Sequence, residues 1–156
     1  MQDNYSLVVI DMQPTAFPAA YDVIDGCSKA IKKTIKSNNP VIYIEYSYSN
    51  FKSEWPTTPR LTNITDNYNK TFYLKKNEQD GSKQITSLIK KNKLPNDKVL
   101  VCGVKTTACV LSTVKGLNNI LKNSSLFILD GAVGGHCNDT WYKRYQDINN
   151  CFIIKI

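Results

Sequence analysis

The stretch between residues 99 and 110 limits the possible folds of this chain more than any other feature. It begins with four apolar or small residues and breaks at Gly103. The apolar residues that follow recur at helical spacing (Val110, Val114, Leu117 and Leu121). A short continuous apolar run is typical of a strand that is covered on both faces of its sheet. This stretch therefore predicts a buried parallel strand that leads into a helix.

The same alternation continues along the chain. Apolar runs predict six strands, at residues 6–10, 41–46, 71–74, 99–102, 126–130 and 151–156. Amphipathic segments predict helices at residues 19–38, 81–93, from 109 onward and, shorter, at 139–148. Strands that alternate with helices predict an α/β fold of three layers, α-β-α, with a doubly wound parallel six-stranded sheet. The length of 156 residues suits a single domain over residues 1–156.

Two segments carry neither a strand nor a helix signal. Residues 47–69 are polar and aromatic with little periodicity, and they predict a long surface excursion. Residues 131–135 contain three glycines and predict a flexible loop after the fifth strand.

The chain is basic, with 20 Lys and Arg against 13 Asp and Glu and a net charge of +7. Such a balance can indicate nucleic acid or an acidic membrane surface as a partner. The basic residues are nevertheless spread in pairs, and no run of five or more occurs. No apolar run approaches the roughly 20 residues that cross a bilayer. We therefore expect neither nucleic acid nor a membrane as a partner.

Cysteine usage bears on the compartment. The five cysteines form no C-x-x-C pair, and they stand at positions 27, 102, 109, 137 and 151. An odd number without paired spacing suits a reducing environment. The first predicted strand starts near residue 6, which leaves no room for a signal segment. The expected location is therefore cytoplasmic.

Three reactive side chains follow predicted strands. Asp11 comes directly after the first strand, one of Lys75 and Lys76 follows the third, and Cys109 stands in the first turn of a helix. Ligands of open α/β sheets bind where the carboxyl ends of the strands lie. A carboxylate can act there as general base and acid, an ammonium can stabilise a thiolate, and a cysteine can attack a carbonyl carbon. The helix start also favours a thiolate at Cys109, although a buried, unreactive cysteine is the alternative.

Two runs of the sequence resemble the signatures of the isochorismatase-like cysteine hydrolases, a superfamily that includes nicotinamidases and N-carbamoylsarcosine amidases. These runs are LVVIDMQ at residues 7–13 and GVKTTACV at residues 103–110. The resemblance implies that Asp11 is the catalytic aspartate and Cys109 the nucleophile. The family lysine precedes a small or acidic pair by four positions, which fits Lys76 before Asp80, with Lys75 as the alternate.

The resemblance also implies a cis peptide bond between Val104 and Lys105. The N–H groups of Lys105 and Cys109 then form an oxyanion hole, and the hydroxyl of Thr106 holds the turn. By the same analogy Phe17 lines the substrate pocket, although it can equally be a core aromatic. Tyr46 is a further candidate for the wall of the pocket, although aromatic residues in a long excursion more often pack it down.

The sequence departs from the metal-binding members of this family. Nicotinamidases bind a metal through an Asp-x-His pair after the second strand, whereas residues 45–50 read EYSYSN and the one histidine is His136. We therefore expect no metal and no cofactor, and a homo-oligomer by analogy with the family.

The function that this resemblance implies is hydrolysis of a C–N bond in a small amide, carbamoyl or ureido compound through a cysteine thioester. The alternative is a catalytically dormant binding or regulatory protein of the same fold. A nucleotide-binding domain is a third reading, but neither a G-x-G-x-x-G run nor a P-loop is present.

Overall fold

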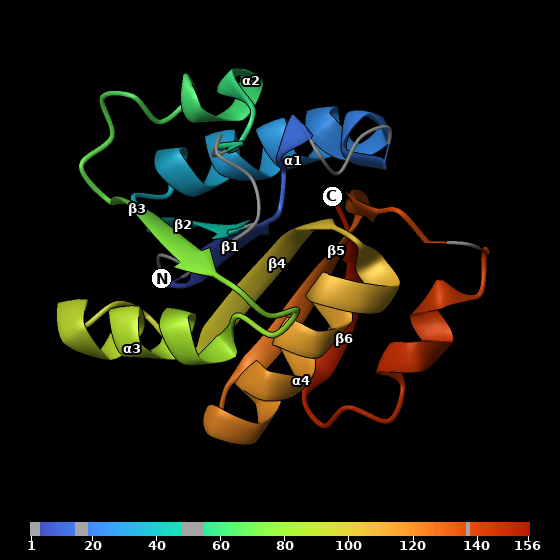
Figure 1. The fold of residues 1–156 in the computed structure, drawn as a ribbon. Helices are drawn as coiled ribbons and strands as arrows, with labels where there is room; N and C mark the ends of the chain where they lie inside the picture. Colours follow the sequence, from blue (N-terminus) through green and yellow to red (C-terminus); the bar gives the residue numbers. More distant parts are fainter. Residues whose placement is uncertain (1–3, 15–18, 48–54, 137) are drawn as a thin grey trace.

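Six strands form one sheet in the computed structural model, which describes residues 4–14, 19–47, 55–136 and 138–156. Their order across the sheet is β3-β2-β1-β4-β5-β6, and every neighbouring pair is parallel (Figure 1). The strands are β1 (Ser6–Ile10), β2 (Val41–Tyr46), β3 (Thr71–Lys76), β4 (Lys98–Val104), β5 (Ser125–Gly134) and β6 (Cys151–Lys155). The predicted doubly wound parallel sheet is confirmed.

Helices lie on both faces of this sheet. α1 (Ala19–Lys36) and the short α2 (Pro59–Thr62) cover one face, and α3 (Ser82–Asn92) and α4 (Leu111–Ile120) cover the other (Figure 1). A π-helical turn, η2 (Thr106–Val110), precedes α4, and a 3₁₀ turn, η3 (Trp141–Tyr145), precedes β6. Among the described residues, no helix has the length and apolar character that a bilayer crossing requires. The result is the expected three-layer arrangement.

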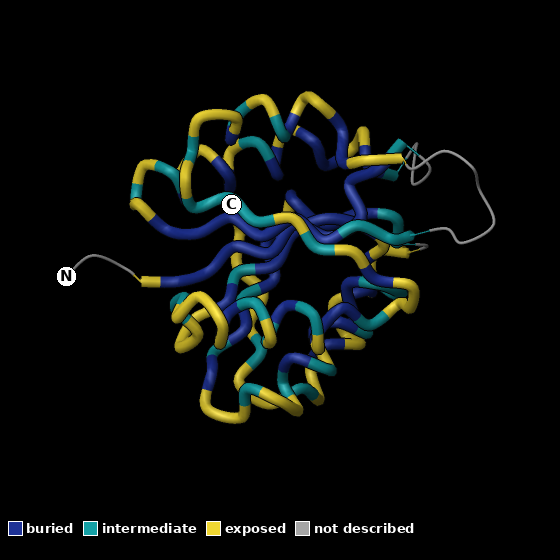
Figure 2. The backbone as a smooth tube through the Cα atoms, turned by 60° about the vertical axis from the view of Figure 1, so that its left-hand side comes forward, coloured by how far each residue is buried: buried dark blue, intermediate teal, exposed yellow. Residues whose placement is uncertain are grey.

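The strand alternation divides the core into two halves. All five residues of β1 are buried, because this strand lies in the middle of the sheet under helices on both sides (Figure 2). Alternate residues point to opposite faces. Leu7, Val9 and Tyr43 therefore pack with α1, while Val8, Ile10 and Ile42 pack with α3 and α4.

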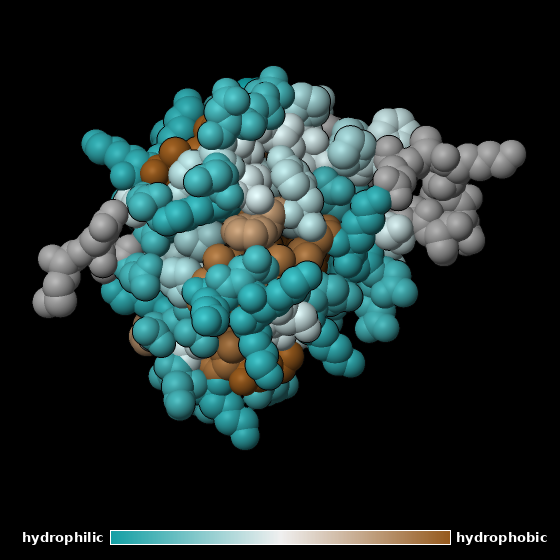
Figure 3. Space-filling model, turned by 90° about the vertical axis from the view of Figure 1, so that its left-hand side faces the viewer, coloured by the Kyte–Doolittle hydropathy of each residue, from teal (hydrophilic) through white to brown (hydrophobic). Residues whose placement is uncertain are grey.

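The sheet ends at β3 on one side and at β6 on the other. At β3, Tyr73 is exposed, while Phe72 and Leu74 are half-buried against the core of α3. The face that carries this edge is mostly hydrophilic, with apolar side chains gathered near its middle (Figure 3).

The topology places the switch point beside β1. This strand pairs with β2 on one side and with β4 on the other, so the chain leaves the sheet in opposite directions from neighbouring strands. Such a switch point leaves a crevice at the carboxyl ends of the strands. Because all strands are parallel, the carboxyl ends of β1, β3 and β4 meet at the same end of the sheet.

Three details differ from the sequence-based expectations. Part of the predicted excursion is helical, namely α2. β5 continues through the glycine-rich segment to Gly134, because its pairing with β4 shifts register between Val101 and Gly103 and Gly131 takes a positive φ of 87°. The predicted helix at 139–148 is only the five-residue turn η3.

α1 lies unusually close to the sheet at Gly26. A Cβ atom on this glycine would lie 1.9 Å from the carbonyl oxygen of Gly131 in β5. The neighbouring Cys27 thiol donates a hydrogen bond to the carbonyl oxygen of Ala132, at 3.3 Å. The helix backbone therefore rests directly on the strand backbone at this point.

Candidate active site

Asp11 lies where β1 ends and is almost completely buried. Its backbone takes a φ of 50°, a left-handed conformation that aspartate adopts more readily than most residues. Its N–H donates to the carbonyl oxygen of Ile44 at 3.0 Å, and its own carbonyl accepts from the N–H of Gln13 at 2.8 Å. The chain therefore turns at Asp11 immediately after the central strand.

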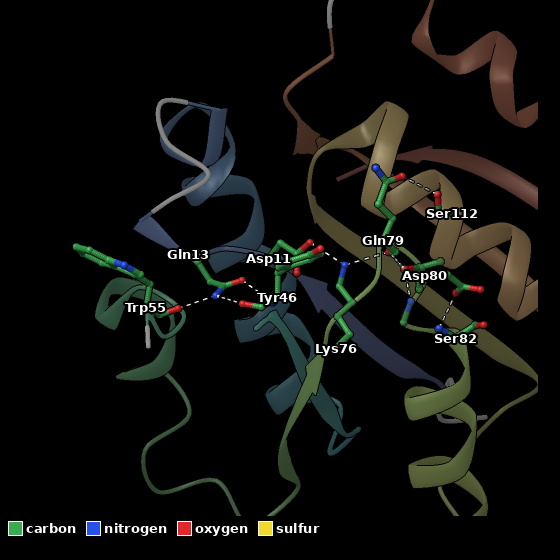
Figure 4. A network of polar contacts seen from close by, with 11 residues as sticks. Asp11, Gln13, Tyr46, Trp55, Lys76, Gln79, Asp80, Ser82 and Ser112 are labelled. Carbon is green, nitrogen blue, oxygen red and sulfur yellow. Dashed lines mark hydrogen bonds and ion pairs between the residues drawn. The ribbon is translucent and has the colours of Figure 1, made fainter. Parts of the chain in front are cut away.

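Lys76, the last residue of β3, points into the same space. Its Nζ donates to Oδ2 of Asp11 at 2.9 Å and to the carbonyl oxygen of Gln79 at 3.0 Å, and its side chain is fully buried (Figure 4). The ammonium also lies 5.4 Å from the ring centroid of Tyr46. Lys75 is exposed, because successive side chains of a strand face opposite sides. The structure thus pairs Lys76, and not Lys75, with Asp11.

Cys109 approaches this pair from η2 and is half-buried. Asp11 and Lys76 both affect the pKa of its thiol, and the thiol in turn affects the pKa of Asp11. The other carboxylate oxygen of Asp11, Oδ1, is buried and makes no hydrogen bond of ordinary geometry among the described residues, although the Cys109 thiol and the Tyr46 backbone lie close enough to lower the pKa of Asp11. The structure therefore brings Asp11, Lys76 and Cys109 together from three separate elements.

The electrostatics of the site favour a protonated thiol. Burial raises the pKa of the Cys109 thiol, the negative charge of Asp11 raises it further, and Lys76 lowers it. Burial also raises the pKa of Asp11, and Lys76 offsets part of that effect. The helix start by itself favours a thiolate, whereas burial and the neighbouring carboxylate act in the opposite direction and raise the pKa of the thiol. The resting site holds a thiol next to a carboxylate that can accept its proton.

The turn between β4 and η2 holds the nucleophile in place. The peptide bond between Val104 and Lys105 is cis. The carbonyl oxygen of Lys105 accepts from the N–H groups of Ala108 and Val110, at 3.0 and 3.1 Å. The Thr106 hydroxyl donates to the carbonyl oxygen of Gly134 at 2.8 Å. Thr106 thereby ties this turn to the end of β5.

The backbone carbonyl group of Thr106 is also held by a hydrogen bond. The Tyr145 hydroxyl in η3 donates to the Thr106 carbonyl oxygen, and both residues are buried. Val104 is buried and Lys105 is exposed. The oxyanion-hole role of residues 104–106 stays a prediction.

Gln13 is a site residue whose role the sequence pattern did not reveal. Its side-chain nitrogen donates to the carbonyl oxygens of Tyr46 and Trp55, at 3.0 and 2.6 Å (Figure 4). Its side-chain oxygen accepts from the N–H of Tyr46 at 2.7 Å. Gln13 therefore joins the ends of β1 and β2 to the chain at Trp55. The sequence offered one signal, which is that this polar residue lies inside the run LVVIDMQ. In the fold, Gln13 is 98% buried.

The predicted pocket residues have different outcomes. Tyr46 is half-buried and lies beside the Lys76 ammonium, so it borders the site. Its contact with substrate stays a prediction. Phe17 lies outside the described residues.

Glu45 and His136, two residues of types that can bind a metal, make other contacts in the structure. The Glu45 carboxylate accepts from the N–H of Thr57 at 2.7 Å. His136 stacks on Trp141 with ring centroids 5.6 Å apart, and its Nδ1 lies 3.5 Å from the Thr106 hydroxyl. Among the residues that the structure describes, no three His, Cys, Asp or Glu side chains group so that they could hold a metal ion.

Asp11→Asn is expected to make the Cys109 thiol more reactive. The negative charge of Asp11 raises the pKa of this thiol, so its removal lowers that pKa and increases the thiolate fraction at a given pH. Alkylation by iodoacetamide at neutral pH should become roughly fivefold faster. Peptide mapping against time at several pH values measures the rate. Cys151, with a pKa raised to about 11, is an internal control that should not change. Unchanged alkylation of Cys109 would contradict this electrostatic description.

Comparisons with known proteins identify the family and the fold of the chain. A family model, the isochorismatase domain, matches residues 5–152. The fold resembles that of N-carbamoylsarcosine amidase from Thermoplasma acidophilum, with a TM-score of 0.81, 17% identity, and coverage of 98% of this chain and 96% of that one. Nicotinamidase from Staphylococcus aureus gives a TM-score of 0.79, 13% identity, and coverage of 96% of each chain.

A third solved structure, a ribonuclease from Caenorhabditis elegans, gives a TM-score of 0.77 and 18% identity, and covers 99% of this chain and 77% of that one. A search of curated proteins found no match. Structural likeness at such low identity shows the fold alone. The family model spans nearly the whole chain, and the chain therefore belongs to the isochorismatase family of hydrolases.

Proposed function

We propose that this protein is a metal-independent cysteine hydrolase that cleaves the C–N bond of a small amide, carbamoyl or ureido compound. One observation carries the proposal: the buried ion pair of Asp11 and Lys76 lies beside the Cys109 thiol at the switch point of the sheet. A base, a cation and a nucleophile at one strand edge are what acyl transfer requires. Family membership supports the same reaction class.

The first half of the reaction uses Asp11 as a base. Asp11 accepts the Cys109 proton while Sγ attacks the carbonyl carbon, and the carbonyl electron pair moves to its oxygen. In this proposal the N–H groups of Lys105 and Cys109 hold the resulting oxyanion. Lys76 helps because its positive charge lowers the pKa of Asp11 and keeps the carboxylate ionised.

The second half uses Asp11 as an acid and then again as a base. The protonated carboxyl gives its proton to the departing nitrogen, the C–N bond breaks, and a thioester on Cys109 remains. Asp11 then takes a proton from water, and the resulting hydroxide attacks the thioester. The acid product leaves, and the proton returns to the thiol. One carboxyl group thus moves every proton in the cycle.

The Oδ1 oxygen of Asp11 supports a substrate that carries an N–H group. Oδ1 is buried and makes no hydrogen bond of ordinary geometry among the described residues, so it can still accept one from a substrate. An amide, carbamoyl or ureido nitrogen can donate to this oxygen before the bond breaks. The same contact places the leaving nitrogen next to the group that protonates it.

The proposal is tested by a screen for ammonia release. The purified protein, dialysed against EDTA, is incubated with nicotinamide, N-carbamoyl amino acids and ureido acids. The expected result is turnover of one class, together with an acyl adduct on the Cys109 peptide that hydroxylamine removes. If no compound releases ammonia and no adduct forms on an intact thiol, the dormant binding protein becomes the better description.

A further inference from the structure

A buried threonine on the helix of the nucleophile contacts the loop that follows Lys76. Thr113 lies four residues after Cys109, in the first turn of α4, and is completely buried. Its hydroxyl accepts from the N–H of Gly81 at 3.1 Å and donates to the carbonyl oxygen of Gln79 at 3.3 Å. One hydroxyl therefore uses both its donor and its acceptor on the loop of residues 77–81.

The same carbonyl of Gln79 also accepts from Lys76, at 3.0 Å. The contacts therefore run from Thr113 to the Gln79 carbonyl, from there to the Lys76 ammonium, and on to Asp11 at 2.9 Å. Lysine is a point charge on a flexible four-carbon stem, so its position depends on where its acceptors are held. Gln79 lies in a loop between β3 and α3, and regular secondary structure does not fix its carbonyl.

A separate observation shows how closely this loop packs against α4. A Cβ atom on Gly116, three residues after Thr113, would lie 2.5 and 2.6 Å from the carboxylate oxygens of Asp80. It would also lie 2.3 Å from the hydroxyl oxygen of Ser82. The Ser112 hydroxyl adds a longer contact of 3.4 Å to the side chain of Gln79 (Figure 4). The loop therefore packs directly against α4.

We propose that Thr113 is a positioning residue that sets where the Lys76 ammonium lies relative to the Cys109 thiol. The reason is that Cys109 and Thr113 lie in successive turns of one continuous helical segment. This segment therefore positions both the nucleophile and, through Thr113, the Gln79 carbonyl that holds the Lys76 ammonium. This inference rests on the proposed function, in which Lys76 acts on Asp11 and Cys109.

The consequence is electrostatic. Among the described residues, the groups that titrate or carry charge around the Cys109 thiol are Asp11, from the end of β1, and Lys76, from the end of β3. Lys76 lowers the pKa of the thiol and Asp11 raises it. Without the Thr113 hydroxyl, the Gln79 carbonyl loses its fixed position, and the ammonium moves away from the thiol. The thiolate fraction at a given pH should then fall.

The test follows the pH profile of Cys109 alkylation by iodoacetamide, which does not depend on turnover. In Thr113→Val we expect the profile to move to higher pH and the rate near pH 8 to fall about threefold. Thr113→Ser keeps both hydrogen bonds and should retain the original profile. Thr34→Val is the matched control, because Thr34 is equally buried and its hydroxyl also makes two hydrogen bonds, but far along α1 from the site.

A double variant separates positioning from general loosening. Lys76→Met removes the cation, so Thr113→Val should add nothing to the profile of Lys76→Met if Thr113 acts through that cation. An additional shift in the double variant, or no shift in Thr113→Val alone, overturns the proposal. Thr113→Ala gives the same comparison if the valine variant does not fold.

These results are independent of the substrate screen. If the profile shifts in a protein without turnover, the shift supports the role of Thr113, and the missing turnover contradicts the proposed hydrolysis. If the protein turns over a substrate but the profiles do not shift, the proposed hydrolysis is supported and the role of Thr113 is overturned.

Discussion

Cys109→Ala is expected to reduce hydrolysis of the substrate found in the screen by at least about a thousandfold. The proposed cycle passes through a thioester on this one sulfur, and no other cysteine lies beside both Asp11 and Lys76 among the described residues. The acyl adduct should disappear together with the activity. Steady-state ammonia release and intact mass after a quench measure the two effects.

The control for this variant is Cys151→Ala. Cys151 is also half-buried and free, but it lies at the start of the edge strand β6. Its replacement should leave turnover within about twofold of the original rate. Residual hydrolysis in Cys109→Ala above one-tenth of the original rate would show that the sulfur is not the nucleophile.

Asp11→Ala is expected to destabilise the protein by about 3–5 kcal/mol. The variant leaves the Lys76 ammonium buried without its countercharge, and an uncompensated buried charge is far more costly than a lost surface contact. For a chain of this length the melting temperature should fall by roughly 10 °C. Urea unfolding followed by circular dichroism measures the change in the free energy of unfolding.

An exposed aspartate supplies the comparison. Asp25 also forms an ion pair, with Arg60 at 3.5 Å, but the two side chains are 86% and 59% exposed. Asp25→Ala should therefore change the free energy of unfolding by no more than about 1 kcal/mol. Equal losses in the two variants would contradict the role of burial.

Lys76→Met should show a different dependence on pH. Lys76 lowers the pKa of Asp11, so its removal raises that pKa further above the ordinary value. Between the ordinary and the raised pKa, the folded state binds a proton that the unfolded state does not. The free energy of unfolding therefore increases as pH falls through this range. Relative to the original protein, Lys76→Met should recover stability as the pH falls from neutrality toward the ordinary pKa of an aspartate, and a constant difference would contradict this.

The sequence predicted the fold well because hydrophobic pattern determines it. Continuous apolar runs such as residues 6–10 and 99–102 are typical of strands that are covered on both faces. Parallel strands bring their carboxyl ends to one edge, so the placement of Asp11 and Cys109 at that edge followed from local pattern. The predicted loop at the glycine-rich residues 131–134 was wrong, because β5 continues through them after a register shift against β4.

The parts that the sequence could not supply depend on tertiary neighbours. The choice between Lys75 and Lys76 depends on which face of an edge strand meets Asp11, and both faces of β3 carry aromatic or apolar residues. The direction of the thiol pKa depends on the burial of Cys109 and on the distant Asp11. The contacts of Gln13 and Thr113 are hydrogen bonds over 33 and 32 residues of sequence, which no local signal encodes.

The contact of α1 with β5 has a consequence for mutational tolerance. Position 26 has no room even for a methyl group, since a Cβ there would overlap the backbone of Gly131. Any substitution must move α1 away from β5, and α1 is the longer of the two helices that cover this face of the sheet. In a saturation library selected for folded protein, glycine should be the sole residue recovered at position 26, whereas exposed neighbours such as Asp25 should accept many residues.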